Sequence, residues 1–200
     1  MKIIEQSYEI LSLPDELLQT IERAGRTCYK SEDKITSDSA KKFVRMLVNR
    51  GHHAMTEFGD IIVKFVTNRG VSHELVRHRL CSFAQESTRY VDYNSDMEFI
   101  RPVWMGDMDD NWFILARTFM AAEKEYRTLR NAGWRPEQAR EVLPNALKTE
   151  IVVKGNVREW RHIFSLRCSK AAHPQMRSLM ISLLEELQGK LPVIFDDIET

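Results

Sequence analysis

Hydrophobic residues recur at helical spacing over several segments of the sequence. Between residues 37 and 50, Ala40, Phe43 and Leu47 fall on one helical face, with Val44 and Val48 beside them. Glycines, prolines and polar caps at the ends of such segments mark where helices begin and stop. The pattern predicts helices at residues 14–24, 37–50, 72–79, 111–132, 136–142 and 174–188, and another that Asn156 caps.

Strict alternation of apolar and more polar residues covers residues 60–67. Ile61, Val63 and Phe65 alternate with their neighbours, as in a strand that buries one face. The next three residues, 68–70, predict a turn. Further strands are predicted at residues 2–11, 98–103 and 150–153.

Helices and strands are mixed along the chain without regular βαβ alternation. The predicted fold class is therefore α+β: one domain over residues 1–200, with a mixed or antiparallel sheet flanked by long helices. In the longest predicted helix, the apolar stripe is expected to form core or a subunit interface rather than a cofactor site. Its members are Trp112, Leu115, Phe119, Ala122, Tyr126 and Leu129.

The composition, 43% hydrophobic and 29% charged, is that of a soluble globular protein. We find no apolar run near the roughly 20 residues that span a bilayer, and the three cysteines form no CxxC pair. We therefore expect a cytoplasmic protein with reduced thiols. The net charge is zero, but two segments are basic, which favours a local anion pocket over general polyanion binding.

The first basic segment covers residues 77–90 and leaves the helix that Ser72 is predicted to cap. It carries Arg77, Arg79 and Arg89 among several hydroxyl side chains. Guanidinium groups and hydroxyls together suit a nucleotide phosphate, each charge-assisted bond contributing roughly 1.5–3 kcal/mol. The alternative is a solvated basic helix end.

The second basic segment follows Asn156. Free N–H groups in the first turn of the predicted helix could hold an anion, and Arg158 and His162 share a face opposite Trp160 and Phe164. The alternative is an ordinary charged outer face. From the residues alone, the sequence predicts a soluble α+β protein with an anion or nucleotide pocket.

Two other chemistries find less support. His73 and His78 are five residues apart and do not form the i, i+4 pair of a helical metal site, so no metal is expected. Cys81 lies among arginines, which would lower a thiol pKa and favour a nucleophile. A packing role for Cys81 is the preferred interpretation.

Arg77-His78-Arg79, followed after seven residues by Ser87, resembles the RHRx7S signature of flavin-dependent thymidylate synthases, and the match extends through Tyr90. Segments in family order surround it. Residues 51–57 (GHHAMTE) are similar to the family's G-H segment, residues 139–144 (AREVLP) to its AR-x-x-LP element, and residues 156–167 to its N-x-R…LR block. The resemblance covers most of residues 20–185.

The resemblance implies roles for individual positions. The implied catalytic residues are Arg167, which would lie against uracil and favour loss of its N3 proton, and His52, which would stand near the flavin ring. The implied FAD-binding residues are Ala54, Arg77, His78, Arg79, Gln85, Asn156, Val157, Arg158 and His162. The implied dUMP-binding residues are Glu74, Leu75, Val76, Arg77, Gln85, Glu86, Ser87, Thr88, Arg89, Arg140 and Arg167.

The resemblance also implies the reaction: dUMP is methylated to dTMP with carbon from 5,10-methylenetetrahydrofolate and hydride from NADPH by way of FAD. It implies a homotetramer that shares FAD between subunits, with no nucleic-acid or membrane partner. Ala54 and Phe58 depart from the family's commoner Ser or Thr and His. The competing interpretations are a nucleic-acid-binding module that uses the basic segments and a nucleotide-binding enzyme without flavin.

Overall fold

The computed structural model describes residues 1–93, 96–106 and 111–200 and divides into two compact units. The first unit comprises Met1–Ser7, Phe65–Arg77 and Ala84–Val152. The second comprises Tyr8–Lys64, His78–Phe83 and Val153–Thr200.

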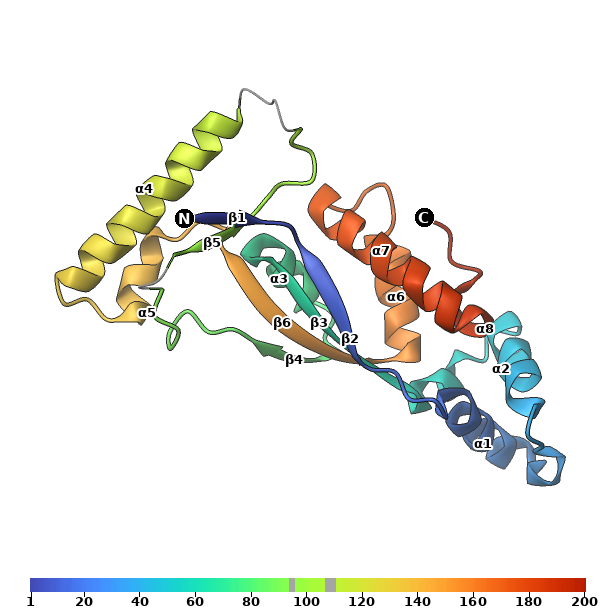
Figure 1. Cartoon of the computed structure of the whole chain (residues 1–200). Helices are drawn as coiled ribbons and strands as arrows, with labels where there is room; N and C mark the ends of the chain where they lie inside the picture. Colours follow the sequence, from blue (N-terminus) through green and yellow to red (C-terminus); the bar gives the residue numbers. More distant parts are fainter. Residues whose placement is uncertain (94–95, 107–110) are drawn as a thin grey trace. The chain divides into compact units, whose positions relative to one another are not determined.

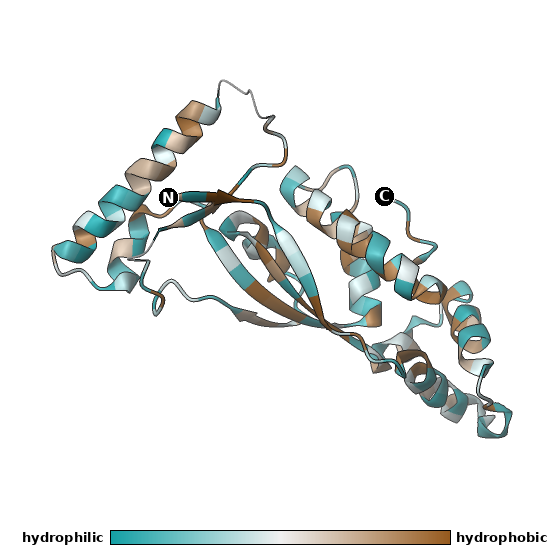
Figure 2. Ribbon diagram, viewed as in Figure 1, coloured by the Kyte–Doolittle hydropathy of each residue, from teal (hydrophilic) through white to brown (hydrophobic). Residues whose placement is uncertain are grey.

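Two sheets contain the strands (Figure 1). The larger has the order β2-β3-β6-β4, with bounds Ser7–Ser12, Asp60–Asn68, Lys148–Asn156 and Ser82–Gln85. Hydrophobic residues recur along β3 and β6 (Figure 2). In the smaller sheet, β1 (Lys2–Ile4) pairs in parallel with β5 (Glu98–Ile100). The predicted α+β class with mixed sheets is confirmed.

Each unit also contains helices. The first unit holds α3 (Arg69–Leu75), α4 (Trp112–Asn131), α5 (Pro136–Ala139) and a 3₁₀ turn at Arg140–Val142. The second holds α1 (Leu17–Tyr29), α2 (Ser39–Asn49), α6 (Val157–Arg167), α7 (Pro174–Lys190), α8 (Pro192–Phe195) and 3₁₀ turns at Glu32–Lys34 and His53–Phe58. Within the described residues, every helix is too short or too polar to cross a membrane.

The core of the first unit forms under α4. The Phe99 and Phe119 rings stack with their centroids 4.6 Å apart, and Tyr126 is fully buried nearby. Every residue of the predicted apolar stripe is buried or half-buried, so the core interpretation is confirmed. Stacked aromatic pairs of this kind add about 0.5–1.5 kcal/mol beyond the area they bury.

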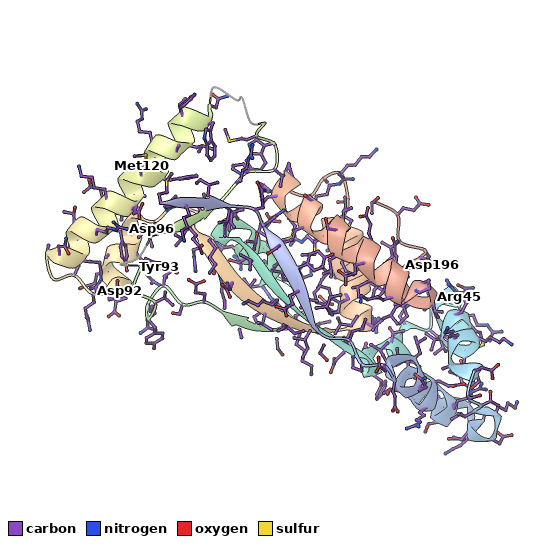
Figure 3. The ribbon with its side chains drawn as sticks, in the orientation of Figure 1. Arg45, Asp92, Tyr93, Asp96, Met120 and Asp196 are labelled. Carbon is purple, nitrogen blue, oxygen red and sulfur yellow. The ribbon has the colours of Figure 1, made fainter. Side chains whose placement is uncertain are left out.

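The core of the second unit forms between α6, α7 and α8. Trp160 and Phe164 of α6 are fully buried, Phe164 meets Phe195 edge to face, and the Trp160 indole N–H donates to the Ile61 carbonyl at 3.1 Å. Arg45 of α2 forms a bidentate ion pair with Asp196 just beyond α8 (Figure 3). These contacts fix α6 within its unit.

The boundaries of α3 correct the sequence prediction. Residues 68–70 were predicted to turn, with Ser72 capping a helix to about residue 79. Instead, the Asn68 side chain accepts the Val71 N–H at 2.8 Å, and the helix begins at Arg69. Ser72 is buried inside the helix, so the asparagine is the true cap.

Other boundaries differ as well. The predicted strand at 2–11 is two strands that join different sheets, and β4 and α8 were not predicted. Gly25 does not end α1, which continues to Tyr29. A Cβ at Gly25 would lie 2.5 Å from Phe43, so this glycine permits close packing of α1 against α2.

We expect Gly25→Ala to lower the free energy of unfolding by about 1–3 kcal/mol, because the added methyl group overpacks the Phe43 ring. That ring already lies under the Arg26 guanidinium, 4.2 Å from its centroid, and has little room to move. Gly189→Ala in α7 is the matched control. A Cβ there meets nothing within 4 Å, so stability should rise by about 0.5 kcal/mol. Urea unfolding measures both changes, and equal effects would contradict the packing argument.

Candidate functional site

The predicted site residues divide between the two units. The first unit contains Glu74, Leu75, Val76, Arg77, Gln85, Glu86, Ser87, Thr88, Arg89 and Arg140. The second contains His52, Ala54, His78, Arg79, Asn156, Val157, Arg158, His162 and Arg167. The signature Arg77-His78-Arg79 is therefore split after its first arginine.

In the first unit, Arg140 and Thr88 come together from segments far apart in the sequence. Arg140 Nη1 donates to the Thr88 hydroxyl at 3.1 Å. Both residues line a cavity of about 300 Å³ together with Arg69, His73, Glu141, Leu143, Pro144 and Asn145. Two guanidinium groups and a hydroxyl at one cavity form a site for an anion.

Arg69 and His73 were not predicted as site residues. They are four residues apart on α3 and so lie on one helical face. Arg69 Nη1 is buried, and among the described residues it has no hydrogen-bond partner. Because residues 68–70 were interpreted as a turn, the helical spacing that joins Arg69 to His73 was missed.

Gln85 and Glu86 are held by neighbouring side chains. The Gln85 amide donates to the buried hydroxyls of Ser72 and Thr149, at 2.8 and 3.2 Å. Glu86 accepts a 2.6 Å hydrogen bond from Tyr93 and pairs with Lys148 at 3.3 Å. These contacts orient both side chains before any ligand binds.

The remaining predicted residues of this unit vary in exposure. Leu75 is fully buried and contributes core packing, whereas Glu74 and Val76 are half-buried and Arg77 is exposed. The Ser87 hydroxyl accepts the Arg89 amide N–H at 3.3 Å, which shapes the turn after β4.

In the second unit, Asn156 caps α6 as predicted. Its side-chain oxygen accepts the Glu159 N–H at 2.9 Å. The N–H of Val157, the residue after Asn156, donates to the Gly59 carbonyl at 2.8 Å, and the Val157 side chain is buried. Asn156 and Val157 therefore fix where α6 begins.

Arg158 and His162 are exposed on the face of α6 opposite Trp160 and Phe164, which confirms the predicted two-sided helix. They line a cavity of about 250 Å³ with His53 and Arg161, neither of which was predicted. Burial, followed by the charges of Arg161 and Arg158, lowers the pKa of His53. The cavity is thus basic, although Arg158 pairs with Glu57 at 2.6 Å and Arg161 with Asp197 at 2.7 Å.

His78 and Arg167 meet at the end of α6. Arg167 Nε donates to His78 Nε2 at 3.1 Å, and His78 Nδ1 lies 3.4 Å from the Glu159 carboxylate. His78 is only 5% exposed. Burial, together with the charges of Arg167 and His162, lowers the pKa of His78 to about 4, so the imidazole is neutral at pH 7.

His52 and Ala54 lie at the 3₁₀ turn His53–Phe58, and both are exposed, as is Arg79. His52 Nδ1 is 2.9 Å from the hydroxyl of Tyr29, a residue the sequence did not single out. This hydrogen bond at Nδ1 restricts the orientation of the His52 ring.

Cys81 is half-buried, and its thiol packs against Gly155, where a Cβ would lie 3.0 Å from Sγ. Burial and the nearby Glu159 charge raise the pKa of the Cys81 thiol to about 12. A thiol with that pKa is not a nucleophile at neutral pH, which agrees with the packing interpretation.

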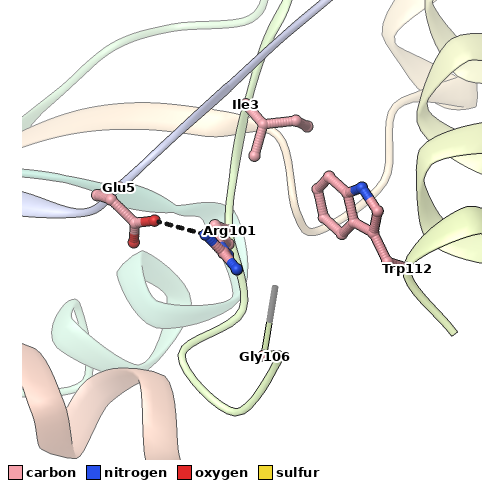
Figure 4. Close-up of a pocket in the computed structure, with 5 residues that line it drawn as sticks. All are labelled: Ile3, Glu5, Arg101, Gly106 and Trp112. Atoms are coloured by element: carbon pink, nitrogen blue, oxygen red, sulfur yellow. Dashed lines mark ion pairs between the residues drawn. The ribbon is translucent and has the colours of Figure 1, made fainter. Parts of the chain in front are cut away.

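Two further observations concern the rest of the described chain. A cavity of about 300 Å³ in the first unit is lined by Ile3, Glu5, Arg101, Gly106 and Trp112 (Figure 4). Its Arg101 lies 3.8 Å from Glu5, so the two charges offset each other. Among residues 1–93, 96–106 and 111–200, no cluster of three His, Cys, Asp or Glu is placed to hold a metal ion.

The fold is α+β, with an arginine-lined cavity in each unit, and comparison with known proteins identifies the family. The family model described as thymidylate synthase complementing protein matches residues 9–193. The chain therefore belongs to this family.

Relatives and solved structures agree with this assignment. A flavin-dependent thymidylate synthase from Corynebacterium efficiens is 34% identical over 197 residues, covering 90% of this chain and 78% of the relative. One from Mycobacterium tuberculosis is 36% identical over 198 residues with the same coverage. The crystal structure of the UMP/dUMP methylase PolB from Streptomyces cacaoi, bound with 5-Br dUMP, has the same fold. Its TM-score is 0.81 at 22% identity, covering 98% of this chain and 96% of that one.

The pH dependence of stability tests whether His78 is buried and neutral. Its folded pKa of about 4 lies below the ordinary 6.5, so between these values the unfolded chain binds a proton that the folded chain lacks. The resulting stability is complete above pH 6.5 and is lost as the pH falls toward 4. Because of His78, the parent's free energy of unfolding should fall by about 2 kcal/mol between pH 7 and pH 5. His78→Asn removes this titration, so the variant should not show that loss.

Urea unfolding at both pH values measures this difference. His73→Asn, at an exposed position, is the control and should follow the parent. If His78→Asn also follows the parent, the imidazole is not held neutral by burial.

Proposed function

We propose that this protein is a flavin-dependent thymidylate synthase that converts dUMP to dTMP. The family match over residues 9–193 and the relatives at 34–36% identity support the activity. The single structural observation that carries the chemistry is the placement of Arg167 against a buried neutral imidazole.

The cavity at Arg140 and Thr88 is the proposed site for the dUMP phosphate. Arg140 and Arg69 supply positive charge there, and the Thr88 hydroxyl supplies a short polar contact. The other predicted dUMP residues are also proposed as dUMP contacts, each at its own position: Glu74, Leu75, Val76, Arg77, Gln85, Glu86, Ser87, Arg89 and Arg167. For the buried Leu75, the backbone is the part available for contact.

Arg167 is the proposed catalytic residue. A guanidinium group beside the pyrimidine stabilises the negative charge that develops when N3 loses its proton, and that charge makes C5 nucleophilic. The protonated, half-buried Cys81 is not required for this step.

The FAD pyrophosphate is proposed to bind in the second unit at the cavity formed by Arg158, His162, Arg161 and His53, because a pyrophosphate needs cationic and N–H donors. When bound, FAD supplies the hydride chemistry that links NADPH to the new methyl group. Asn156, Val157, Arg158 and His162 would hold it together with Arg77, His78, Arg79, Gln85 and the backbone of Ala54, and His52 would stand near its ring. The one-carbon donor is proposed to be 5,10-methylenetetrahydrofolate.

A single cytoplasmic domain that assembles into a homotetramer is part of the proposal. On α4, the side chains of Phe113, Ile114 and Met120 are 76%, 55% and 59% exposed. Large apolar side chains gathered on one helix are typical of surfaces that contact another subunit. This supports assembly through α4.

Arg167→Ala tests the catalytic assignment. It should remain folded and lose turnover by roughly 100- to 1,000-fold, the usual effect of removing a preorganised electrostatic group. Release of the uracil C5 proton measures the loss, and the purified parent should show a flavin absorption band. Arg45→Ala, which breaks the Asp196 ion pair, is the arginine control and should keep its turnover. Full turnover by Arg167→Ala, or a colourless parent, would refute the proposal.

Arg140→Ala tests the nucleotide site. Loss of one charge-assisted hydrogen bond of about 1.5–3 kcal/mol should raise KM for dUMP by roughly 10- to 150-fold. Arg135→Ala is the matched control, because the Arg135 side chain is 72% exposed and pairs with Glu137. Steady-state kinetics at varied dUMP distinguish the two variants. An unchanged KM in Arg140→Ala would remove the residue from the site.

A further inference from the structure

We propose that Glu159 is a positioning residue that orients the Arg167 guanidinium through the imidazole of His78. The inference rests on the proposed function, because it assumes that Arg167 acts on the substrate. Glu159 stands at an unspecified position within the N-x-R…LR block, and its side chain is buried, with 6% exposure.

The hydrogen-bond chemistry of Arg167 determines the tautomer of His78. An arginine Nε always carries a proton and can only donate, so His78 Nε2, at 3.1 Å, must accept. A neutral imidazole then carries its single proton on Nδ1. That nitrogen faces the Glu159 carboxylate at 3.4 Å. The three residues therefore form a directed chain from carboxylate to imidazole to guanidinium.

The backbone of α6 places both ends of this chain. Glu159 and Arg167 are eight residues apart, close to two helical turns, so both lie toward His78. The Glu159 amide N–H is bonded to the Asn156 side chain, which fixes the first turn. His78 supplies the intermediate group, and its ring also meets His162 edge to face with centroids 6.0 Å apart.

Burial strengthens the interaction between the Glu159 carboxylate and the His78 imidazole. A carboxylate taken out of water costs several kcal/mol unless a donor faces it. Across the 3.4 Å contact, the carboxylate attracts a proton on His78 Nδ1, so Glu159 favours the tautomer in which Nε2 accepts from Arg167. Another nearby polar group, the Cys81 thiol, remains protonated beside this charge.

The consequence for catalysis is orientation. With Nε committed to His78, the plane of the Arg167 guanidinium is fixed relative to the imidazole. A group that is already held in its working geometry has no free-energy cost of reorganisation during the reaction. Without Glu159, the imidazole could carry its proton on Nε2, and that N–H would oppose the N–H of Arg167.

Two substitutions of similar volume separate orientation from packing. Glu159→Gln retains an oxygen that can accept from Nδ1, whereas Glu159→Met fills the space without an acceptor. In the flavin-loaded enzyme, we expect Glu159→Met to lower kcat by about 10-fold with KM for dUMP within about 2-fold of the parent, as for other supports of a reactive group. Glu159→Gln should restore most of kcat.

The tautomer itself is the second measurement. In ¹⁵N-histidine-labelled protein, NMR should show His78 protonated on Nδ1 in the parent and in Glu159→Gln, and a mixture of tautomers in Glu159→Met. Glu22→Ala, which removes a buried glutamate paired with Arg26 in the same unit, is the control. It should lower stability and leave both kcat and the His78 tautomer unchanged.

The outcomes are distinguishable. An unchanged His78 tautomer in Glu159→Met, or equal losses of kcat in the Gln and Met variants, overturns the positioning role. If Arg167→Ala keeps full turnover, the proposed function of Arg167 fails instead, whatever the tautomer shows. Loss of kcat and change of tautomer together in Glu159→Met, with rescue by Gln, support the proposal.

Discussion

The second unit depends on the junction where β6 ends and α6 begins. Asn156 accepts the Glu159 N–H, and the Val157 N–H donates to Gly59, so the helix has a fixed start and direction. From that start, the 3.6-residue repeat buries Trp160 and Phe164 on one side. The same repeat turns cations outward and places Arg167 at the last residue of the helix.

The charged side chains have different kinds of partner in the two units. In the first, Lys148 pairs with Glu150 at 2.7 Å and with Glu86 at 3.3 Å, and the Arg140 guanidinium lies at a cavity, 4.0 Å from Glu141. In the second, the imidazole between Arg167 and Glu159 is kept neutral, so the buried contact joins one cation to one anion without adding a third charge. Such an arrangement limits the desolvation cost of burying ionisable groups.

Much of the local structure could be predicted from the sequence, and the failures have physical causes. The Asn156 cap, the buried stripe of α4 and the strand over residues 60–67 follow from periodicity and capping chemistry, which act within a few residues. The start of α3 was missed because Asn68 and Gly70 favour turns as well as helix ends, and packing decides between them. Gly25 was misplaced because only contact with Phe43 shows why α1 needs a glycine there.

By itself, the sequence determined the α+β class, the two basic segments and, through ordered motifs, the family, because these depend on residue types and short spacings. Only the tertiary structure decided which charged groups meet. Arg69 joins Arg140, and Glu159 faces His78, across long sequence separations. The folding of the chain decides such contacts, because an arginine has the same charge wherever it stands, while its partners and its burial depend on what packs around it.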